Sequence, residues 1–141
     1  MLGVPALNDR GYTGRGVTIG VLDTGFDTYR TTGCLTGLKV AATRNFIRGG
    51  GDVSGDDHGT WALACIAGNL PGEYRSAAPD AVFLLAVTDD PSTETRADED
   101  RWVAAVEWCD SLGADIVSSS LVYNEFDTPG ESYTKDQMDG R

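Results

Sequence analysis

Short apolar runs alternate with helical patterns along the chain. Runs of β-branched and aliphatic residues bounded by turn-forming residues predict buried strands, as in a parallel sheet. The predicted strands are residues 16–22, 38–47, 81–88 and 116–122, and the second has the weakest pattern. The first of these strands leads directly into Asp23.

A helix is predicted over residues 58–67, after a loop rich in Gly and Asp. Gly68 follows it, where a glycine often ends a helix in the left-handed conformation. The sequence therefore predicts a loop-to-helix junction at His58 and a left-handed cap at Gly68.

A second helix is predicted over residues 98–112. Trp102, Val106 and Cys109 recur at the i, i+4, i+7 spacing of a buried helical face, and acidic residues crowd the first turn. Gly113 follows as a stop signal. Strands that alternate with helices predict an α/β fold, a parallel sheet flanked by helices, and the length fits one domain, or a piece of one, over residues 1–141.

The acidic balance of the chain restricts its partners. Among 141 residues, 22 acidic and 11 basic side chains give a net charge of −11. Such a surface repels phosphate backbones, so no nucleic acid partner is expected.

The longest apolar run, residues 81–87, is far shorter than the roughly 20 residues that span a bilayer, so no membrane span is expected.

The chain has three cysteines, an odd number from which no complete disulfide framework can be inferred. Cys65 and Cys109 lie within the predicted helices. Small thiols in such apolar patterns are commonly buried, so both are predicted to be packed and free.

The candidate chemistry centres on Asp23 and on His58, the only histidine. Asp23 ends a strand and His58 begins a helix, so both are expected beyond the carboxyl ends of the strands, where α/β proteins gather reactive groups. An aspartate that orients a histidine is one part of nucleophilic catalysis, in which the imidazole takes a proton from a hydroxyl. A structural histidine and an ordinary turn aspartate are the alternatives.

Four segments together resemble the subtilisin-like serine proteases, peptidase family S8. Residues 14–25 (GRGVTIGVLDTG) resemble the aspartate motif of that family, and residues 57–60 (DHGT) with 65–68 (CIAG) resemble its histidine motif. Residues 77–81 (AAPDA) and 113–121 (GADIVSSSL) are similar to two later segments, in the same order.

This resemblance implies a serine-type endopeptidase with a three-layer α/β/α fold, of which the chain is expected to hold an incomplete part. It assigns catalytic roles to Asp23 and His58. Substrate binding falls to Ser119, Ser120 and Leu121, along which an extended peptide or protein substrate would pair. No cofactor is required; a structural calcium ion is compatible with the family but has no assignable site. The family also implies a secreted or cell-envelope location, although the chain shows no signal peptide.

The chain departs from the family pattern at two motif positions. Trp61 stands where many members carry a second histidine, a position expected to support the helix. Val122 replaces a glycine and is expected to narrow the pocket for the residue before the cleaved bond.

The family motifs that hold the nucleophilic serine and the oxyanion-hole asparagine are absent. We interpret Ser118, Ser119 and Ser120 as core and substrate-groove residues, because no nucleophile elbow surrounds them. The chain is therefore predicted to be the first half of a catalytic domain and to be inactive alone. The alternative is a non-catalytic, protease-like binding or scaffold domain.

Three other interpretations are weaker. The triplet Asp23-Thr24-Gly25 also matches aspartic proteases, but those are β-rich and need two such aspartates. An aspartyl phosphotransferase would need a second acid where Gly25 stands. The glycines of residues 11–16 precede a strand, unlike those of a phosphate-binding loop.

The acidic loop with Asp52, Asp56 and Asp57 carries the hard oxygen ligands that calcium prefers. It lacks the spacing of a calcium-binding loop, so a solvated loop is the favoured interpretation.

Overall fold

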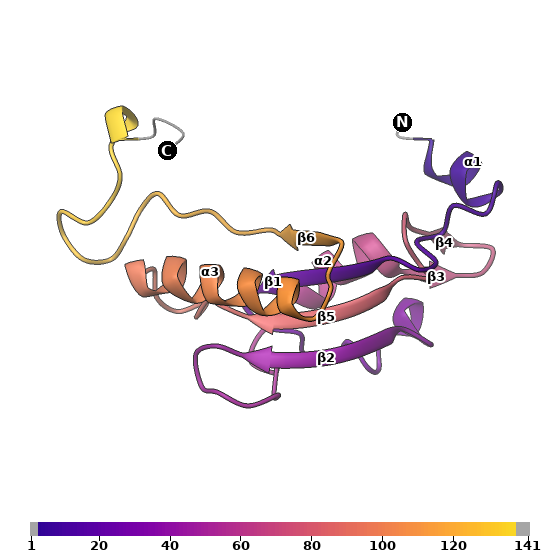
Figure 1. The fold of residues 1–141 in the computed structure, drawn as a ribbon, viewed down its shortest axis with the longest axis horizontal. Coiled ribbons are helices and arrows are strands. Elements are labelled where there is room, and N and C mark those ends of the chain that lie inside the picture. The colour runs from indigo at the N-terminus through magenta and orange to yellow at the C-terminus, as the bar shows by residue number, and fades with distance from the viewer. Residues whose placement is uncertain (1–2, 138–141) are drawn as a thin grey trace.

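The computed structural model describes residues 3–137. Four strands form a parallel sheet in the order β2-β5-β1-β6 (Figure 1). Their bounds are β1 Thr18–Asp23, β2 Lys39–Asn45, β5 Val82–Val87 and β6 Ile116–Ser119. The four predicted strands and the parallel sheet are confirmed, but β6 ends three residues earlier than predicted.

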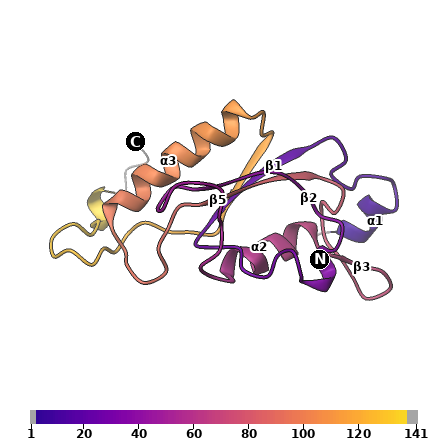
Figure 2. The same ribbon diagram turned by 90° about the horizontal axis from the view of Figure 1, so that it is seen from below.

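Two helices cover opposite faces of this sheet, as the edge-on view shows (Figure 2). Alternate residues of β1 and β5 point to opposite sides. Val21 and Phe83 pack with Leu63 of α2 (His58–Ala67), whereas Leu22 and Leu84 pack with α3 (Arg96–Ser111). The prediction of three layers, a parallel sheet between helices, is confirmed.

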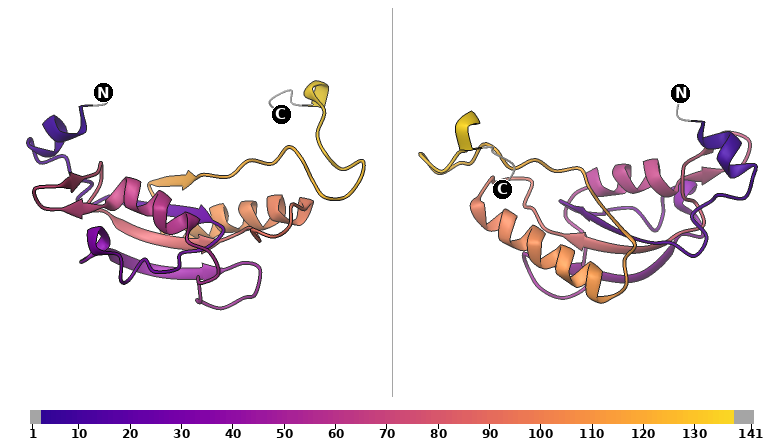
Figure 3. Two further views of the ribbon diagram at one scale, coloured as in Figure 1. Left: turned by 180° about the vertical axis from the view of Figure 1, so that it is seen from behind. Right: turned by 45° about the horizontal axis from the view of Figure 1, so that its top comes forward.

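Several short elements were not predicted, because they are too short to show periodicity. They are α1 Val4–Asn8, the 3-10 turns Gly33–Leu35 and Lys135–Gln137, and the antiparallel pair β3 Asn69–Leu70 and β4 Tyr74–Arg75. After β6 the chain runs beside the first turns of α3 (Figure 3). This path was also not predicted, since residues 123–137 are polar and aperiodic.

Glycines allow close contacts between α3 and the sheet and at the end of α2. A Cβ atom at Gly20 would lie 2.6 Å from Sγ of Cys109, so α3 approaches β1 only because that atom is missing. Gly113 has the left-handed φ of 80° expected of a stop. The left-handed cap predicted at Gly68 is wrong: its φ is −59°, and glycine is needed there because a Cβ would lie 2.5 Å from the Ala64 carbonyl oxygen.

The cysteine prediction is half right. Cys109 is buried against the sheet, but Cys65 is exposed and Cys34 half-buried, all three as free thiols. The buried positions of α2 include Leu63 and Ala67, so residue 65 lies on the outer face of that helix. A helical pattern rich in alanine does not identify which face is buried.

Candidate active site

Asp23 and His58 meet at the carboxyl edge of the sheet. Asp23 is the last residue of β1, paired with Val87, and its side chain is completely buried. His58 is the first residue of α2, and its Nδ1 lies 2.7 Å from Oδ1 of Asp23. The imidazole remains 45% exposed, so a reactant can reach it. The predicted hydrogen-bonded pair is present.

The carboxylate of Asp23 is satisfied on one oxygen only. Oδ1 accepts hydrogen bonds from the Thr24 backbone N–H (2.8 Å) and from His58, and the Thr24 hydroxyl lies 3.1 Å away. Oδ2 is buried and has no hydrogen-bond partner within residues 3–137. An unsatisfied buried acceptor costs roughly 1–3 kcal/mol.

Two glycines let the loop after β1 interlock with the loop before α2. A Cβ at Gly25 would lie 2.4 Å from the backbone nitrogen of Asp56. A Cβ at Gly59 would lie 2.3 Å from the carbonyl oxygen of Gly25 and 2.9 Å from Cβ of Asp23. The glycines that follow the aspartate and the histidine are thus what allows the two side chains to meet.

Asp27 fastens the same two loops together. Its backbone N–H donates to the Asp56 carbonyl (2.8 Å), its Oδ1 accepts from the Gly55 N–H (2.9 Å), and its carbonyl accepts from the Thr60 hydroxyl. Sequence analysis did not single out Asp27. Its position two residues after the Asp-Thr-Gly triplet gives no pattern that distinguishes it from a solvated loop residue.

The groups around His58 raise its pKa. The hydrogen bond to Asp23 raises the pKa of His58, and the charge of Asp23 adds to it, while burial opposes it and Asp56 raises it further. The hydrogen bond from Thr24 lowers the pKa of Asp56. An imidazole with a raised pKa is a stronger base than an isolated one, which suits proton abstraction.

The predicted substrate segment lies one strand away from this pair. Ser119 pairs with Leu22 at the end of β6, and Ser120 then leaves the sheet beside the carboxyl end of β1. Ser119 and Ser120 are exposed, while Leu121 is half-buried. The indole N–H of Trp102 donates to the Ser119 hydroxyl (3.0 Å).

The interpretation of Ser118, Ser119 and Ser120 as partly core residues is wrong for this structure. Ser118 is half-buried and the other two are exposed, because β6 is the sheet edge and has no neighbour on its outer side within the described residues. A cavity of about 430 Å³ adjoins the segment. Its lining combines α3 with the chain after β6: Glu99, Trp102, Ser119, Leu121, Val122 and Tyr123.

The two motif departures are both at the surface. Trp61 is 64% exposed and lies edge-on to His58, with ring centroids 6.4 Å apart. It therefore flanks the histidine, and the expectation that it supports the helix through packing is not met. Val122 is 71% exposed at the rim of the cavity.

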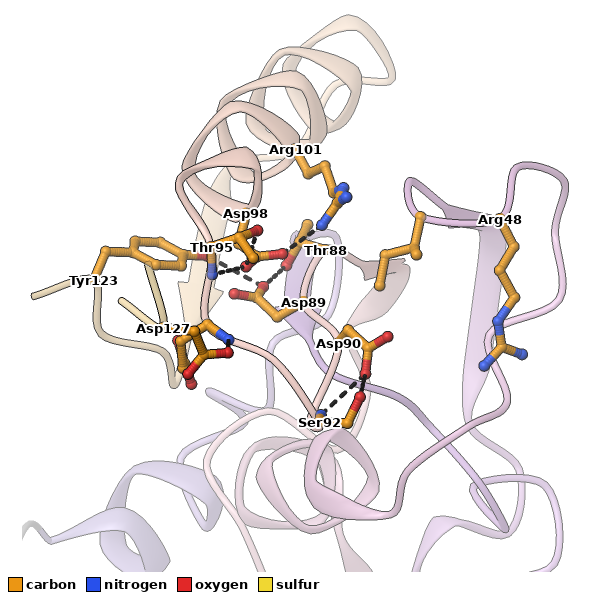
Figure 4. A network of polar contacts seen from close by, with 12 residues as sticks. Arg48, Thr88, Asp89, Asp90, Ser92, Thr95, Asp98, Arg101, Tyr123 and Asp127 are labelled. Carbon is orange, nitrogen blue, oxygen red and sulfur yellow. Dashed lines mark hydrogen bonds and ion pairs between the residues drawn. The ribbon is translucent and has the colours of Figure 1, made fainter. Parts of the chain in front are cut away.

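A further polar network, missed by sequence analysis, lies beyond the end of β5 (Figure 4). Oδ2 of Asp89 accepts hydrogen bonds from the hydroxyls of Tyr123 (3.1 Å) and Thr88. Burial raises the pKa of Asp89. Asp98 accepts from Thr95 in a capping box at the start of α3 and also pairs with Arg101. The network holds the chain after Leu121 against the sheet.

The acids considered for calcium accept hydrogen bonds from the protein, Asp52 from its own loop and Asp56 and Asp57 from the loop after β1. Asp52 accepts from the Ser54 N–H (3.0 Å), and Asp57 accepts from the Thr28 hydroxyl (3.1 Å). Asp56 accepts from the Thr24 hydroxyl (2.5 Å). Across residues 3–137, no three His, Cys, Asp or Glu side chains are grouped as metal ligands. In the same range, no helix is both long and apolar enough to cross a bilayer.

Comparison with curated proteins finds the subtilisins. The chain is 29% identical to subtilisin from Bacillus pumilus over 122 residues, which cover 83% of this chain and 41% of that protein. It is 27% identical to Subtilisin DY from Bacillus licheniformis over 115 residues, 79% of this chain and 39% of that protein. The chain thus spans about two fifths of the length of these relatives. No protein-family model matches it.

Solved structures agree on the fold. MycP1 with its N-terminal propeptide removed matches with a TM-score of 0.60 and 25% identity, over 82% of this chain and 35% of that one. The MycP3 protease from the type VII (ESX-3) secretion system matches with a TM-score of 0.64 and 23% identity, over 82% of this chain and 34% of that one. The three-layer fold expected from the motifs is confirmed.

Proposed function

We propose that this chain, a subtilisin-like serine protease sequence, supplies the aspartate and the histidine of a peptide-hydrolysing site. Asp23 orients His58, and His58 takes the proton of a serine hydroxyl. Residues 1–141 would then form part of one catalytic domain. The serine and the oxyanion-hole donor would come from polypeptide other than the segments that carry the aspartate and histidine motifs.

One observation carries this proposal. The Nδ1 of His58 lies 2.7 Å from a completely buried carboxylate at the end of a central strand, while the ring itself stays 45% exposed. A merely structural histidine would use its hydrogen bonds within the fold. Here one nitrogen is held by the acid and the ring still has an accessible face, which is the arrangement that a general base requires.

The chemistry follows from this geometry. His58, held by Asp23 through Nδ1, accepts the serine proton on Nε2 as the serine oxygen attacks the peptide carbonyl. The imidazolium so formed is stabilised by the buried charge of Asp23. It then gives the proton to the departing amine, and the carbon–nitrogen bond breaks. A water molecule then attacks the acyl-enzyme by the same steps and releases the carboxyl end of the cleaved peptide.

Substrates are peptides or proteins, as for the relatives. We infer that an extended peptide pairs its backbone with Ser119, Ser120 and Leu121, which lie at and after the end of β6, beside the carboxyl end of β1. Backbone pairing does not read side chains, so it suits broad specificity. Val122 at the cavity rim would limit the bulk of one substrate side chain.

The remaining expectations for this function concern its setting. Hydrolysis through Asp23 and His58 consumes only water, so we propose that no cofactor is needed and leave a structural calcium ion unassigned. We also propose a secreted or cell-envelope location, in keeping with the subtilisin relatives.

The direct test compares two proteins: residues 1–141, and the same chain together with the coding sequence that follows Arg141. Both are assayed for casein cleavage with and without a serine-directed inhibitor. We expect no cleavage by residues 1–141, because triad members act as a unit and loss of one costs on the order of 10⁶ in rate. We expect inhibitor-sensitive cleavage by the longer protein and its loss in His58→Ala.

Two outcomes would contradict the proposal. Inhibitor-sensitive cleavage by residues 1–141 would show that a serine within these residues is the nucleophile and would overturn the interpretation of Ser118, Ser119 and Ser120. An inactive longer protein that carries a serine in the family motif would instead favour a non-catalytic, protease-like binding domain.

A further inference from the structure

The hydroxyl of Thr24 lies between two carboxylates. Its Oγ1 is 2.5 Å from Oδ2 of Asp56 and 3.1 Å from Oδ1 of Asp23. A hydroxyl has one proton, so it can donate to only one of them. The shorter distance is typical of a strong bond from a hydroxyl to a carboxylate, and the longer one lies outside the usual range. The proton is therefore directed to Asp56.

We propose that Asp56 is a positioning residue for the Asp23–His58 pair: it takes the Thr24 hydroxyl proton and thereby leaves Oδ1 of Asp23 to the His58 ring. The inference concerns the same site and rests on the proposed roles of Asp23 and His58. It assigns a function to an acid that the family motifs leave open.

Asp56 is held where it can do this. Its carbonyl accepts the Asp27 N–H (2.8 Å), and Gly25 packs against its backbone nitrogen so closely that a Cβ would lie 2.4 Å away. The backbone of Asp56 therefore cannot move without opening the junction between the two loops. Its lowered pKa, caused first by the Thr24 hydrogen bond, keeps it ionised at neutral pH, as an acceptor that outcompetes Asp23 must be.

Asp56 raises the pKa of His58 in two ways, by direct attraction and through the Thr24 hydroxyl. The groups that act on the ring are Asp23 from β1 and Asp56 from the loop before α2, and both raise its pKa. Without the charge of Asp56, the direct attraction is lost. Without its acceptor, the Thr24 hydroxyl turns to Oδ1 of Asp23 and weakens the hold of that oxygen on the imidazolium.

Asp57 provides a matched control. It is next to His58 in sequence, carries the same charge, and is half-buried like Asp56. Its carboxylate accepts a hydrogen bond from the Thr28 hydroxyl (3.1 Å) and not from Thr24. It is not among the charges that shift His58.

The experiment is an NMR titration of the imidazole in the whole 141-residue chain, where His58 is the only histidine and gives one assignable signal. The proteins are wild type, Asp56→Asn, Asp57→Asn, Thr24→Val and the double variant Thr24→Val/Asp56→Asn. Wild type is also titrated in concentrated urea, as the unfolded reference. No step depends on catalytic activity.

We expect Asp56→Asn to lower the ratio of charged to neutral imidazole about threefold at a pH near the midpoint, and Asp57→Asn to change it much less. In the Thr24→Val background the effect of Asp56→Asn should shrink, because only the direct attraction remains. Equal effects of the two asparagine variants would overturn the inference. So would an Asp56→Asn effect that is the same in the Thr24→Val background as in the wild-type background.

A different result separates this inference from the proposed function. If wild type titrates identically in buffer and in urea, the Asp23–His58 pair does not form, and both ideas fail. If wild type titrates higher in buffer than in urea but Asp56→Asn matches wild type, the pair stands and only the role of Asp56 is wrong.

Discussion

The centre of the sheet and its β6 edge differ in how completely their side chains are enclosed. Five of the six residues in β1, and five of six in β5, are buried, and the loops that carry Asp23 and His58 interlock with no room for a Cβ. In β6 no residue is buried, and Ile116 is 53% exposed. The acid–base pair is thus rigidly built, while the segment proposed to bind substrate lies on an edge that further polypeptide can cover.

This contrast separates the Asp23–His58 pair from the β6 edge. The Asp23–His58 distance depends on contacts local to two loops and on the register of β1 with β5. The edge segment depends on whatever packs on its outer side. Predictions that compare the two regions test whether this division is real.

The largest difference should appear between a core and an edge substitution. Phe83→Ala in β5 removes a completely buried ring and should cost about 3–5 kcal/mol of unfolding free energy. Ile116→Ala in β6 should cost below about 1 kcal/mol, because about half of this residue is already exposed to solvent. Urea denaturation of both variants measures this. Similar losses would mean that the β6 face is covered in solution, for example by a second copy of the chain.

The next largest effect concerns the junction of the two loops. Gly59→Ala places a methyl group 2.3 Å from the Gly25 carbonyl oxygen and should destabilise the protein by about 3 kcal/mol. Gly33→Ala is the matched control, since a Cβ there meets nothing within 4 Å and needs no left-handed backbone. Thermal unfolding compares them. A neutral Gly59→Ala would show that the loops can separate without cost.

A smaller, local effect is expected at the chain after β6. Arg96 donates to the Tyr133 hydroxyl (2.6 Å) and the Glu131 carbonyl (2.5 Å), and its guanidinium lies over the Phe126 and Tyr133 rings. Arg96→Ala should release this segment at a cost of about 1–2 kcal/mol and speed limited proteolysis within residues 123–134 severalfold. Arg30→Ala is the control, because Arg30 also lies over a tyrosine ring and donates to its hydroxyl, but that ring belongs to the adjacent residue Tyr29.

The smallest effect is the pH dependence contributed by the pair. Because Asp23 raises the pKa of His58 above its unfolded value, the pair stabilises the fold fully below about pH 6.5. This contribution is lost as the pH rises through the folded pKa. The difference in unfolding free energy between wild type and His58→Gln should therefore fall from about pH 5.5 to about pH 8.5. A difference that is constant or grows with pH would contradict the raised pKa.

Strong local patterns were predictable from the sequence. The strands around Val21 and Leu85 and the helix that begins at His58 have continuous apolar runs or clear boundaries, and the Asp23–His58 contact follows from strand ends and helix starts sharing one edge. The catalytic roles of these residues, and the binding role of Ser119, stay predictions that the geometry accommodates.

What escaped prediction depends on contacts that follow no sequence period. The sequence around Gly68 does not reveal that the Tyr74 ring folds back against it and, with the Ala64 carbonyl, excludes a side chain there. The Asp89–Tyr123 contact joins residues that are 34 positions apart and follows no period. Whether the serines of β6 are buried or exposed depends on whether another strand or helix lies beside β6, which the pattern of this segment does not reveal.

Because α3 lies so close to Gly20, the reactivity of Cys109 reports whether α3 has separated from the sheet. Burial raises the pKa of its thiol to about 11, so in the closed state it is both shielded and protonated at neutral pH. A thiol reagent should modify exposed Cys65 rapidly and Cys109 only when α3 lifts from the sheet. The rate of that slow modification reports how often α3 detaches from the sheet.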